Sequence, residues 1–140
     1  MVDLRFLLDT NTISELFRLQ PNSSIATKYA RNIDDIAIAS VTWHEILYGF
    51  HRLPTSRRKE ELGFFLRQII RPNVSILDYG EDEAEWFASE RARLTRMGRM
   101  PSYADGQIAA IAAAHNLILV TRNVSDYSDF SGLAIENWFE

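Results

Sequence analysis

The sequence predicts an α/β protein with three layers (α/β/α), in which helices cover both faces of a central parallel sheet. Short apolar runs alternate along the chain with longer segments whose apolar residues recur at helical spacing. Strands and helices that alternate in this way form a parallel sheet with a helix in each crossover. No repeat, linker or low-complexity segment interrupts the pattern, and 140 residues make one domain of ordinary size. We therefore expect a single domain over residues 1–140.

Five apolar runs predict the strands. The first is Phe6-Leu7-Leu8, which stops at Asp9, and the second is Ile36-Ala37-Ile38-Ala39. The fourth, Leu117-Ile118-Leu119-Val120, is equally apolar. The expected bounds of the five strands are about 4–9, 36–39, 74–77, 117–121 and 133–136.

Six segments between these runs predict helices. They cover about 12–18, a stretch after 21–24, 42 to Pro54, 56 to Pro72, 82–97 and 103–115. Thr12 with Glu15, and Thr42 with Glu45, have the spacing of a capping box, which predicts a helix start at each threonine. Ser102 is expected to cap the last of these helices.

Composition excludes several classes of protein. With 46% hydrophobic residues, no cysteine and no run of about 20 apolar residues, the chain is neither a disulfide scaffold nor a membrane span. Asp3 and Arg5 interrupt the only apolar stretch near the start, so no signal peptide and a cytoplasmic location are expected. The net charge of −4 argues against non-specific coating of nucleic acid but allows a local basic patch.

Carboxylates follow the apolar runs repeatedly. Asp9 ends the first run, Glu45 comes shortly after the second, and Asp105 opens the helix that leads into the fourth. Asp126 lies just beyond the fourth run. Loops at the carboxyl ends of parallel strands form the ligand crevice of such sheets, so these acids predict a cation site there.

Each of these acids also has an ordinary structural explanation. Asp9 suits a turn at a strand end, and Glu45 suits a capping box with Thr42. Asp105 matches a capping box with Ser102, yet it lies on the apolar stripe of its helix, where an ionised group is costly without compensation.

The fourth position of the site stays open at this point. Asn123 and Asp126 each suit a loop, and spacing does not decide which of them faces the site. We assign Asp126 as the acidic member. Asn11, Thr121 and Asn123 are expected to support it and the other acids, because the ligands of a metal need neighbours that orient them.

Three or four carboxylates without cysteine suit Mg²⁺ or Mn²⁺ better than zinc. No two of the three histidines have the spacing that places two imidazoles on one metal from a single helix. Carboxylate-held Mg²⁺ usually serves phosphoryl or phosphodiester chemistry. Arg93, Arg96 and Arg99, which repeat every third position before Asp105, are candidates to contact a phosphate backbone, although a solvated helix face explains them as well.

Four segments of the chain contain the candidate site residues. In order, they are Leu7-Leu8-Asp9-Thr10-Asn11, Ser40-Val41-Thr42-Trp43-His44-Glu45-Ile46 with Gly49, Ala104-Asp105-Gly106-Gln107-Ile108-Ala109-Ala110, and Thr121-Arg122-Asn123-Val124-Ser125-Asp126-Tyr127. These segments resemble the PIN-domain ribonucleases, and within them the VapC and FitB toxins of bacterial type II toxin–antitoxin pairs. The resemblance spans the whole chain. Tyr127 stands where many relatives have phenylalanine.

The resemblance implies a PIN-like fold and an endoribonuclease. It implies Asp9, Glu45, Asp105 and a fourth residue, at the position of Asn123 or of Asp126, as ligands of Mg²⁺ or Mn²⁺. It also implies a homodimer and a small cognate antitoxin that wraps the nuclease and intrudes on its site.

The apolar content of two segments also predicts a partner. Residues 12–19 and 56–70 carry more large apolar side chains than one helix face against a sheet requires. Phe64 and Phe65 are adjacent on a helix and point about 100° apart, so they cannot face the same core. Together with Phe17, they are expected to line a groove for a helix or strand of the antitoxin.

Other functions fit the sequence less well. A dinucleotide-binding domain needs a glycine-rich turn after the first strand, and residues 9–12 contain no glycine. A P-loop is absent as well. A phosphoaspartyl phosphohydrolase remains an alternative, although Asn11 stands where the Asp-x-Asp type has its second acid. A catalytically inactive module that binds RNA or a partner is the non-enzymatic alternative.

Overall fold

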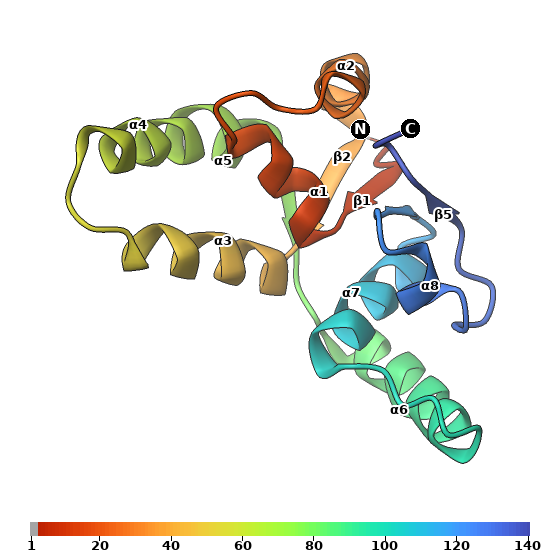
Figure 1. Ribbon diagram of the computed structural model, residues 1–140. Helices are drawn as coiled ribbons and strands as arrows, with labels where there is room; N and C mark the ends of the chain where they lie inside the picture. The colour runs from red at the N-terminus through yellow and green to blue at the C-terminus, as the bar shows by residue number, and fades with distance from the viewer. Residues whose placement is uncertain (1–2) are drawn as a thin grey trace.

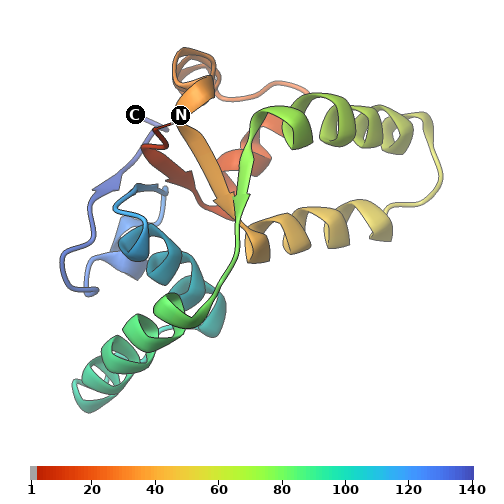
Figure 2. The ribbon, with the colours of Figure 1, turned by 180° about the vertical axis from the view of Figure 1, so that it is seen from behind.

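The computed structural model describes residues 3–140 and shows a five-stranded parallel sheet between two layers of helices (Figures 1 and 2). The strands are β1 (Phe6–Leu8), β2 (Ile36–Ala39), β3 (Ser75–Leu77), β4 (Ile118–Val120) and β5 (Ile135–Glu136). Their order across the sheet is β3-β2-β1-β4-β5, and every neighbouring pair is parallel. The predicted three-layer α/β/α fold is therefore confirmed.

The helices provide the crossovers between these strands. The α-helices are α1 (Thr10–Ser14), α2 (Ser23–Arg31), α3 (Ser40–Arg52), α4 (Arg57–Phe65), α5 (Arg71–Asn73), α6 (Glu81–Arg96), α7 (Tyr103–Ala114) and α8 (Val124–Tyr127). The described chain also contains two 3₁₀ turns and one π-helical turn. These are η1 (Glu15–Phe17), η2 (Ile33–Asp35) and the π-helical turn η3 (Leu66–Ile70). Within residues 3–140 no helix has the length and apolar character that crossing a membrane requires.

Alternate residues of the central strands serve two separate cores. Leu7 of β1 faces α6 and α7, where it packs in one cluster with Phe87 and Ile111. Phe6 and Leu8 face the opposite layer, which is formed by α1, α2, α3 and η3. Side chains on a strand point alternately to the two faces, so a strand covered on both faces must be apolar at every position. This explains why the strand runs are continuously apolar.

Helices α3 and α4 extend as a hairpin beyond the edge of the sheet (Figure 1). Gly63 of α4 lies against Phe50 of α3, and a Cβ at Gly63 would stand 3.1 Å from the phenyl ring. The sequence predicts that the helix beginning with α4 ends before Pro72. In the structure it continues to Asn73 through the π-helical turn η3. The π-helical turn just before Pro72 adapts the helix to the missing proline N–H.

The two capping boxes predicted at threonines are wrong. Helix α1 begins at Thr10 and is capped by Asp9, and α3 begins at Ser40, so Thr12 and Thr42 are buried residues inside the first turns. Helix α3 begins at the residue after β2, and α1 begins two residues after the end of β1, so each helix has already started before its threonine. The cap at Ser102 is confirmed, since its hydroxyl accepts a hydrogen bond from the N–H of Asp105.

Candidate functional site

One cleft at the carboxyl edge of the sheet gathers all four acids that the sequence singled out. The cleft has a volume of about 110 Å³. It is lined by Asp9, Thr10, Asn11, Glu45, Ala104, Asp105, Ile108, Asn123, Asp126 and Tyr127. Parallel strands point their carboxyl ends to the same edge, so β1, β2 and β4 deliver their following loops and helices to this one place. Of the residues that the structure describes, no lysine or arginine lines the cleft.

Asp9 is fixed at the floor of the cleft by two hydrogen bonds. Its Oδ1 accepts from the backbone N–H of Thr12 (2.9 Å), and its Oδ2 accepts from the hydroxyl of Thr121 (2.6 Å). The side chain is 4% exposed. The Thr121 oxygen in turn accepts from the N–H of Asn123 (3.0 Å). Thr121 does not line the cleft but fixes one oxygen of Asp9, and its supporting role at a metal site stays a prediction.

Asp105 lies in the first turn of α7, half-buried, and accepts a hydrogen bond from the hydroxyl of Tyr127 (3.0 Å). The next residue, Gly106, brings α7 close to α6. A Cβ at Gly106 would lie 1.9 Å from the buried ring of Phe87, so any larger residue would force the ring or the helices to shift. The glycine beside Asp105 is therefore required for packing of the helix that carries the acid.

Glu45, unlike Asp9 and Asp105, is exposed. It lies in the second turn of α3 and lines the cleft, but it cannot serve a capping box because Thr42 is not a cap. Thr42 is buried instead, and its hydroxyl accepts a hydrogen bond from that of Thr10 (3.2 Å). A Cβ at Gly49, one turn further along α3, would meet no atom within 4 Å. The carboxylate of Glu45 therefore reaches the cleft beside an open face of its helix.

Both candidates for the fourth position lie in the cleft. The short helix α8, which the sequence did not predict, begins after Asn123 and carries Asp126 and Tyr127. Asn123 and Asp126 are both exposed, and both line the cleft together with Asn11. Tyr127 is 2% exposed, and its hydrogen bond to Asp105 was not expected from the sequence. Because two residues 22 positions apart form it, only the fold brings them together.

The side chains of the cleft fit a hard cation. All of its charged groups are carboxylates, and the absence of a basic residue among the lining side chains leaves their negative charge uncompensated. Within residues 3–140, no three acidic or histidine side chains stand close enough to enclose an ion on their own. Mg²⁺ usually keeps several waters and takes only one or two carboxylates directly, so an open set of carboxylates suits it.

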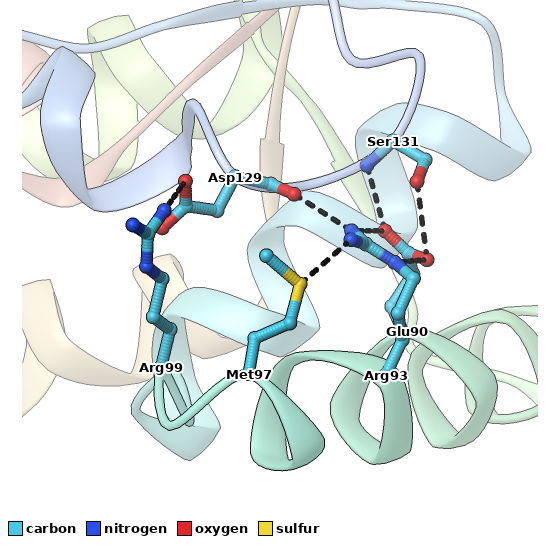
Figure 3. A network of polar contacts seen from close by, with 6 residues as sticks. All are labelled: Glu90, Arg93, Met97, Arg99, Asp129 and Ser131. Carbon is cyan, nitrogen blue, oxygen red and sulfur yellow. Dashed lines mark hydrogen bonds and ion pairs between the residues drawn. The ribbon is translucent and has the colours of Figure 1, made fainter.

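The three arginines expected to contact RNA lie outside the cleft. Arg93 forms two hydrogen bonds with Glu90 (2.9 and 3.0 Å) and donates to the carbonyl oxygen of Asp129 (2.7 Å), as Figure 3 shows. Arg99 pairs with the carboxylate of Asp129 (3.1 Å), and Arg96 is exposed. The hydrogen bonds from Arg93 hold the pKa of Glu90 below its usual value. A contact of these arginines with RNA stays a prediction.

The same network fastens the chain that follows α8. Glu90 of α6 accepts a hydrogen bond from the N–H of Ser131 (2.6 Å). Together with the bond from Arg93 to Asp129, it holds residues 129–131 against α6 (Figure 3). These residues follow directly on Asp126 and Tyr127. Glu90 and Arg93 therefore stabilise the segment that carries one side of the cleft.

Comparison with known proteins agrees with this geometry. Residues 6–130 match the PIN domain family. The chain is 30% identical over 137 residues to VapC ribonuclease Y4jK of Sinorhizobium fredii, covering 96% of this chain and 97% of that protein. It is 34% identical over 124 residues to toxin FitB of Neisseria gonorrhoeae, covering 86% and 89% of the two chains.

Solved structures show the same fold. The crystal structure of FitAcB from Neisseria gonorrhoeae superposes with a TM-score of 0.89 at 31% identity, covering 96% of this chain and 99% of the other. The DNA-bound VapBC structure from Salmonella typhimurium gives a TM-score of 0.84 at 30% identity, with 96% and 98% covered. The chain therefore belongs to the PIN-domain family, among relatives of the VapC and FitB type.

Proposed function

We propose that this protein is a metal-dependent endoribonuclease and the toxin of a type II toxin–antitoxin pair. The observation that carries the proposal is the cleft in which Asp9, Glu45, Asp105 and Asp126 meet without any basic side chain. The cleft lies in a PIN-domain chain, and relatives of this family are named as ribonucleases. Hydrolysis of RNA is therefore the chemistry that we propose for the cleft.

Asp9, Glu45 and Asp105 would hold Mg²⁺ or Mn²⁺ in this proposal, and Asp126 or Asn123 would complete the set or orient a water. A bound ion supplies a more acidic water and stabilises charge on the phosphate oxygens. The chain itself supplies the orientation. Thr121 and the N–H of Thr12 fix both oxygens of Asp9, and Tyr127 fixes one oxygen of Asp105.

A phosphoaspartyl mechanism is less well supported by the surroundings of Asp9. A nucleophilic carboxylate must move toward the phosphorus atom as the new bond forms, which would break hydrogen bonds that hold it in place. Asp9 is 4% exposed, and each of its two oxygens already accepts a hydrogen bond. The arrangement suits a carboxylate that is held in place to bind a cation better than one that attacks.

RNA is the proposed substrate, and one relative, from Salmonella typhimurium, is named a tRNA(fMet)-specific endonuclease. The test incubates the purified protein with a structured RNA in Mg²⁺, in Mn²⁺ and in EDTA, and with a DNA of the same sequence. We expect internal cleavage of the RNA only with a divalent ion. Equal cleavage in EDTA would contradict the metal dependence, and no cleavage of RNA under any of these conditions would contradict the activity.

A cognate antitoxin and a homodimer are the proposed partners. Leu19 and Phe64 are 83% and 65% exposed, and such large apolar side chains on a surface are typical of a partner site. A groove of about 290 Å³ lies between α3 and the helix of α4 and η3, and Trp43, Leu47 and Phe50 contribute to it. The proposal of a homodimer rests on the family resemblance alone. A measurement of the protein's mass in solution tests it directly.

A further inference from the structure

A second cleft opens beside the acidic one and carries the opposite charge. Its volume is about 550 Å³, and it is lined by Asn11, Ser14, Glu15, Arg18, Arg122, Asn123 and Phe139. Asn11 and Asn123 also line the acidic cleft, so the two clefts adjoin. A third hollow continues the path, because it shares Arg18 and adds Leu19, Gln20 and Arg58. A groove that begins at the four acids therefore runs past three arginines.

Arg122 lines the second cleft, next in sequence to Asn123, which lines both clefts. It directly follows Thr121, the buried residue whose hydroxyl binds Asp9 at 2.6 Å, so its backbone is fixed relative to the acids. Its guanidinium carbon lies 4.6 Å from the centre of the Phe139 ring. A guanidinium that stacks on an aromatic ring keeps its N–H groups free at the edge and loses few rotamers when it binds.

Within residues 3–140 the guanidinium of Arg122 has no direct acidic partner, although its charge acts on Glu15 at longer range. Among residues 3–140 it forms no hydrogen bond and no ion pair within 4.0 Å, and the side chain is exposed. Glu15, the acid of this cleft, is bound by the N–H of Asn22 (2.9 Å) and by Arg18 (3.3 Å). These contacts, first that of Asn22, keep the pKa of Glu15 below its usual value. Two arginines against one glutamate leave the cleft with one net positive charge.

We propose that Arg122 binds the backbone phosphate next to the phosphodiester that is cleaved in the acidic cleft, with Arg18 on the same path and Phe139 as a positioning residue for Arg122. The inference rests on the proposed endoribonuclease function and adds to it the path of the RNA strand over the protein surface. A single-stranded RNA has one phosphate per nucleotide, so a strand with one phosphate at the acids must place its neighbours outside them. The arginine-lined cleft that adjoins the acids supplies guanidinium groups, which phosphate prefers as hydrogen-bond donors. One guanidinium can bind two oxygens of the same phosphate.

The experiment compares two substrates that contain the same cleaved step, a dinucleotide with one phosphodiester and a hexanucleotide with flanking phosphates. The variant is Arg122→Gln. Arg52→Gln is the matched control, since its guanidinium carbon also stacks on an aromatic ring, 5.0 Å from the centre of Tyr48, but lines none of these clefts. We expect R122Q to raise KM for the hexanucleotide about tenfold, with kcat and the dinucleotide KM nearly unchanged. R52Q should change neither.

A binding measurement tests the same inference without cleavage. In the Asp105→Asn background, the dissociation constant of the hexanucleotide is measured at several salt concentrations. Loss of one phosphate contact should lower the slope of log Kd against log salt by about 0.7 in R122Q and leave it unchanged in R52Q. An unchanged slope, or an equal rise of KM for both substrates, would overturn the role of Arg122. Failure of the wild-type protein to cleave either RNA would instead contradict the proposed function.

Discussion

The hydroxyl of Tyr127 donates a hydrogen bond to Oδ1 of Asp105 across 3.0 Å, which ties α8 to the first turn of α7 inside the acidic cleft. Burial, aided by the charge of Asp105, raises the pKa of Tyr127 well above its usual value, so the hydroxyl remains a donor. A phenylalanine, which the family resemblance places here in many relatives, has no such donor. This chain therefore orients one of its proposed metal ligands with a group that a phenylalanine lacks.

Tyr127→Phe removes only the oxygen and should weaken binding of Mn²⁺. The ring keeps its place in the core, while Asp105 loses the donor that fixes its rotamer. Partners that orient a metal ligand are worth about 10-fold to 100-fold in affinity. We expect an affinity about tenfold lower by isothermal titration calorimetry, with the fold retained. Wild-type affinity in the variant would show that Tyr127 does not orient the site.

Thr121→Val replaces the hydroxyl that joins Asp9 to Asn123 by a methyl group of similar size. Oδ2 of Asp9 then loses a buried donor and the N–H of Asn123 loses its acceptor. We expect the free energy of unfolding in urea to fall by about 2 kcal/mol. Thr95→Val is the control, because the Thr95 hydroxyl binds the Arg91 carbonyl on an exposed turn of α6. A loss no larger in T121V than in T95V would contradict the role of Thr121.

The fold and most of the acidic cleft follow from the sequence because they depend on local pattern. Continuous apolar runs identify β1, β2 and β4, and the rule that ligands bind at the carboxyl ends of parallel strands then brings Asp9, Glu45 and Asp105 together. Both helix starts were placed two residues too late, at Thr12 and Thr42, because the chain enters each helix within two residues of a strand end, with Asp9 and Ala39 at the cap positions.

The remaining features depend on pairs that are distant along the chain. Tyr127 meets Asp105 and Arg93 meets Asp129 only after the sheet and α6 have formed, so no spacing signals either contact. Phe17, expected to line the partner groove, is half-buried and packs against the core and Phe65, with 5.6 Å between the ring centres. The exposed apolar residue of its segment is Leu19, which helical periodicity did not single out because the helix has already ended.

Glu90→Gln should destabilise the protein at neutral pH but not in acid. The pKa of Glu90 is lowered in the folded protein, first by the hydrogen bonds from Arg93, against 4.5 for an unperturbed glutamate. The ionised carboxylate therefore stabilises the fold above about pH 4.5, and this contribution disappears as the pH falls through the folded pKa.

We expect the variant to lose about 1 kcal/mol at pH 7, a modest value because water screens the partly exposed Arg93. The difference from wild type should shrink below pH 4.5, as followed by urea unfolding at several pH values. Glu85→Gln, on an exposed position of the same helix, is the control and should have little effect. A loss that persists unchanged at pH 3 would show that the charge of Glu90 is not the cause.

Leu19→Asp together with Phe64→Asp should release the nuclease from its antitoxin. Both side chains are highly exposed, so the substitutions place charge on the proposed partner surface without entering the core. We expect inhibition at a fixed antitoxin concentration to be lost, while the free enzyme cleaves the dinucleotide as before, because that substrate has no phosphate to place in the hollow that Leu19 lines. Met100→Asp, which changes an exposed apolar residue between α6 and α7, is the control. Full inhibition of the double variant would place the antitoxin elsewhere.

Asp105→Asn removes one charge of the acidic cleft and keeps the oxygen that accepts from Tyr127. The carboxylates repel one another when no cation is bound, so the variant without metal should melt at a higher temperature than wild type. Mg²⁺ should raise the melting temperature of wild type and have little effect on the variant, because a ligand stabilises only the protein that binds it. A similar Mg²⁺-dependent rise in both proteins would contradict Asp105 as a ligand.

The rate of RNA cleavage by this same variant in saturating Mg²⁺ tests the central claim most directly. Asp9, Glu45, Asp105 and Asp126 are proposed to act together through a bound ion, so loss of one should lower the rate by about 100-fold or more in a protein that remains folded. Cleavage by Asp105→Asn at the wild-type rate would contradict the account and show that the acidic cleft is not the catalytic site.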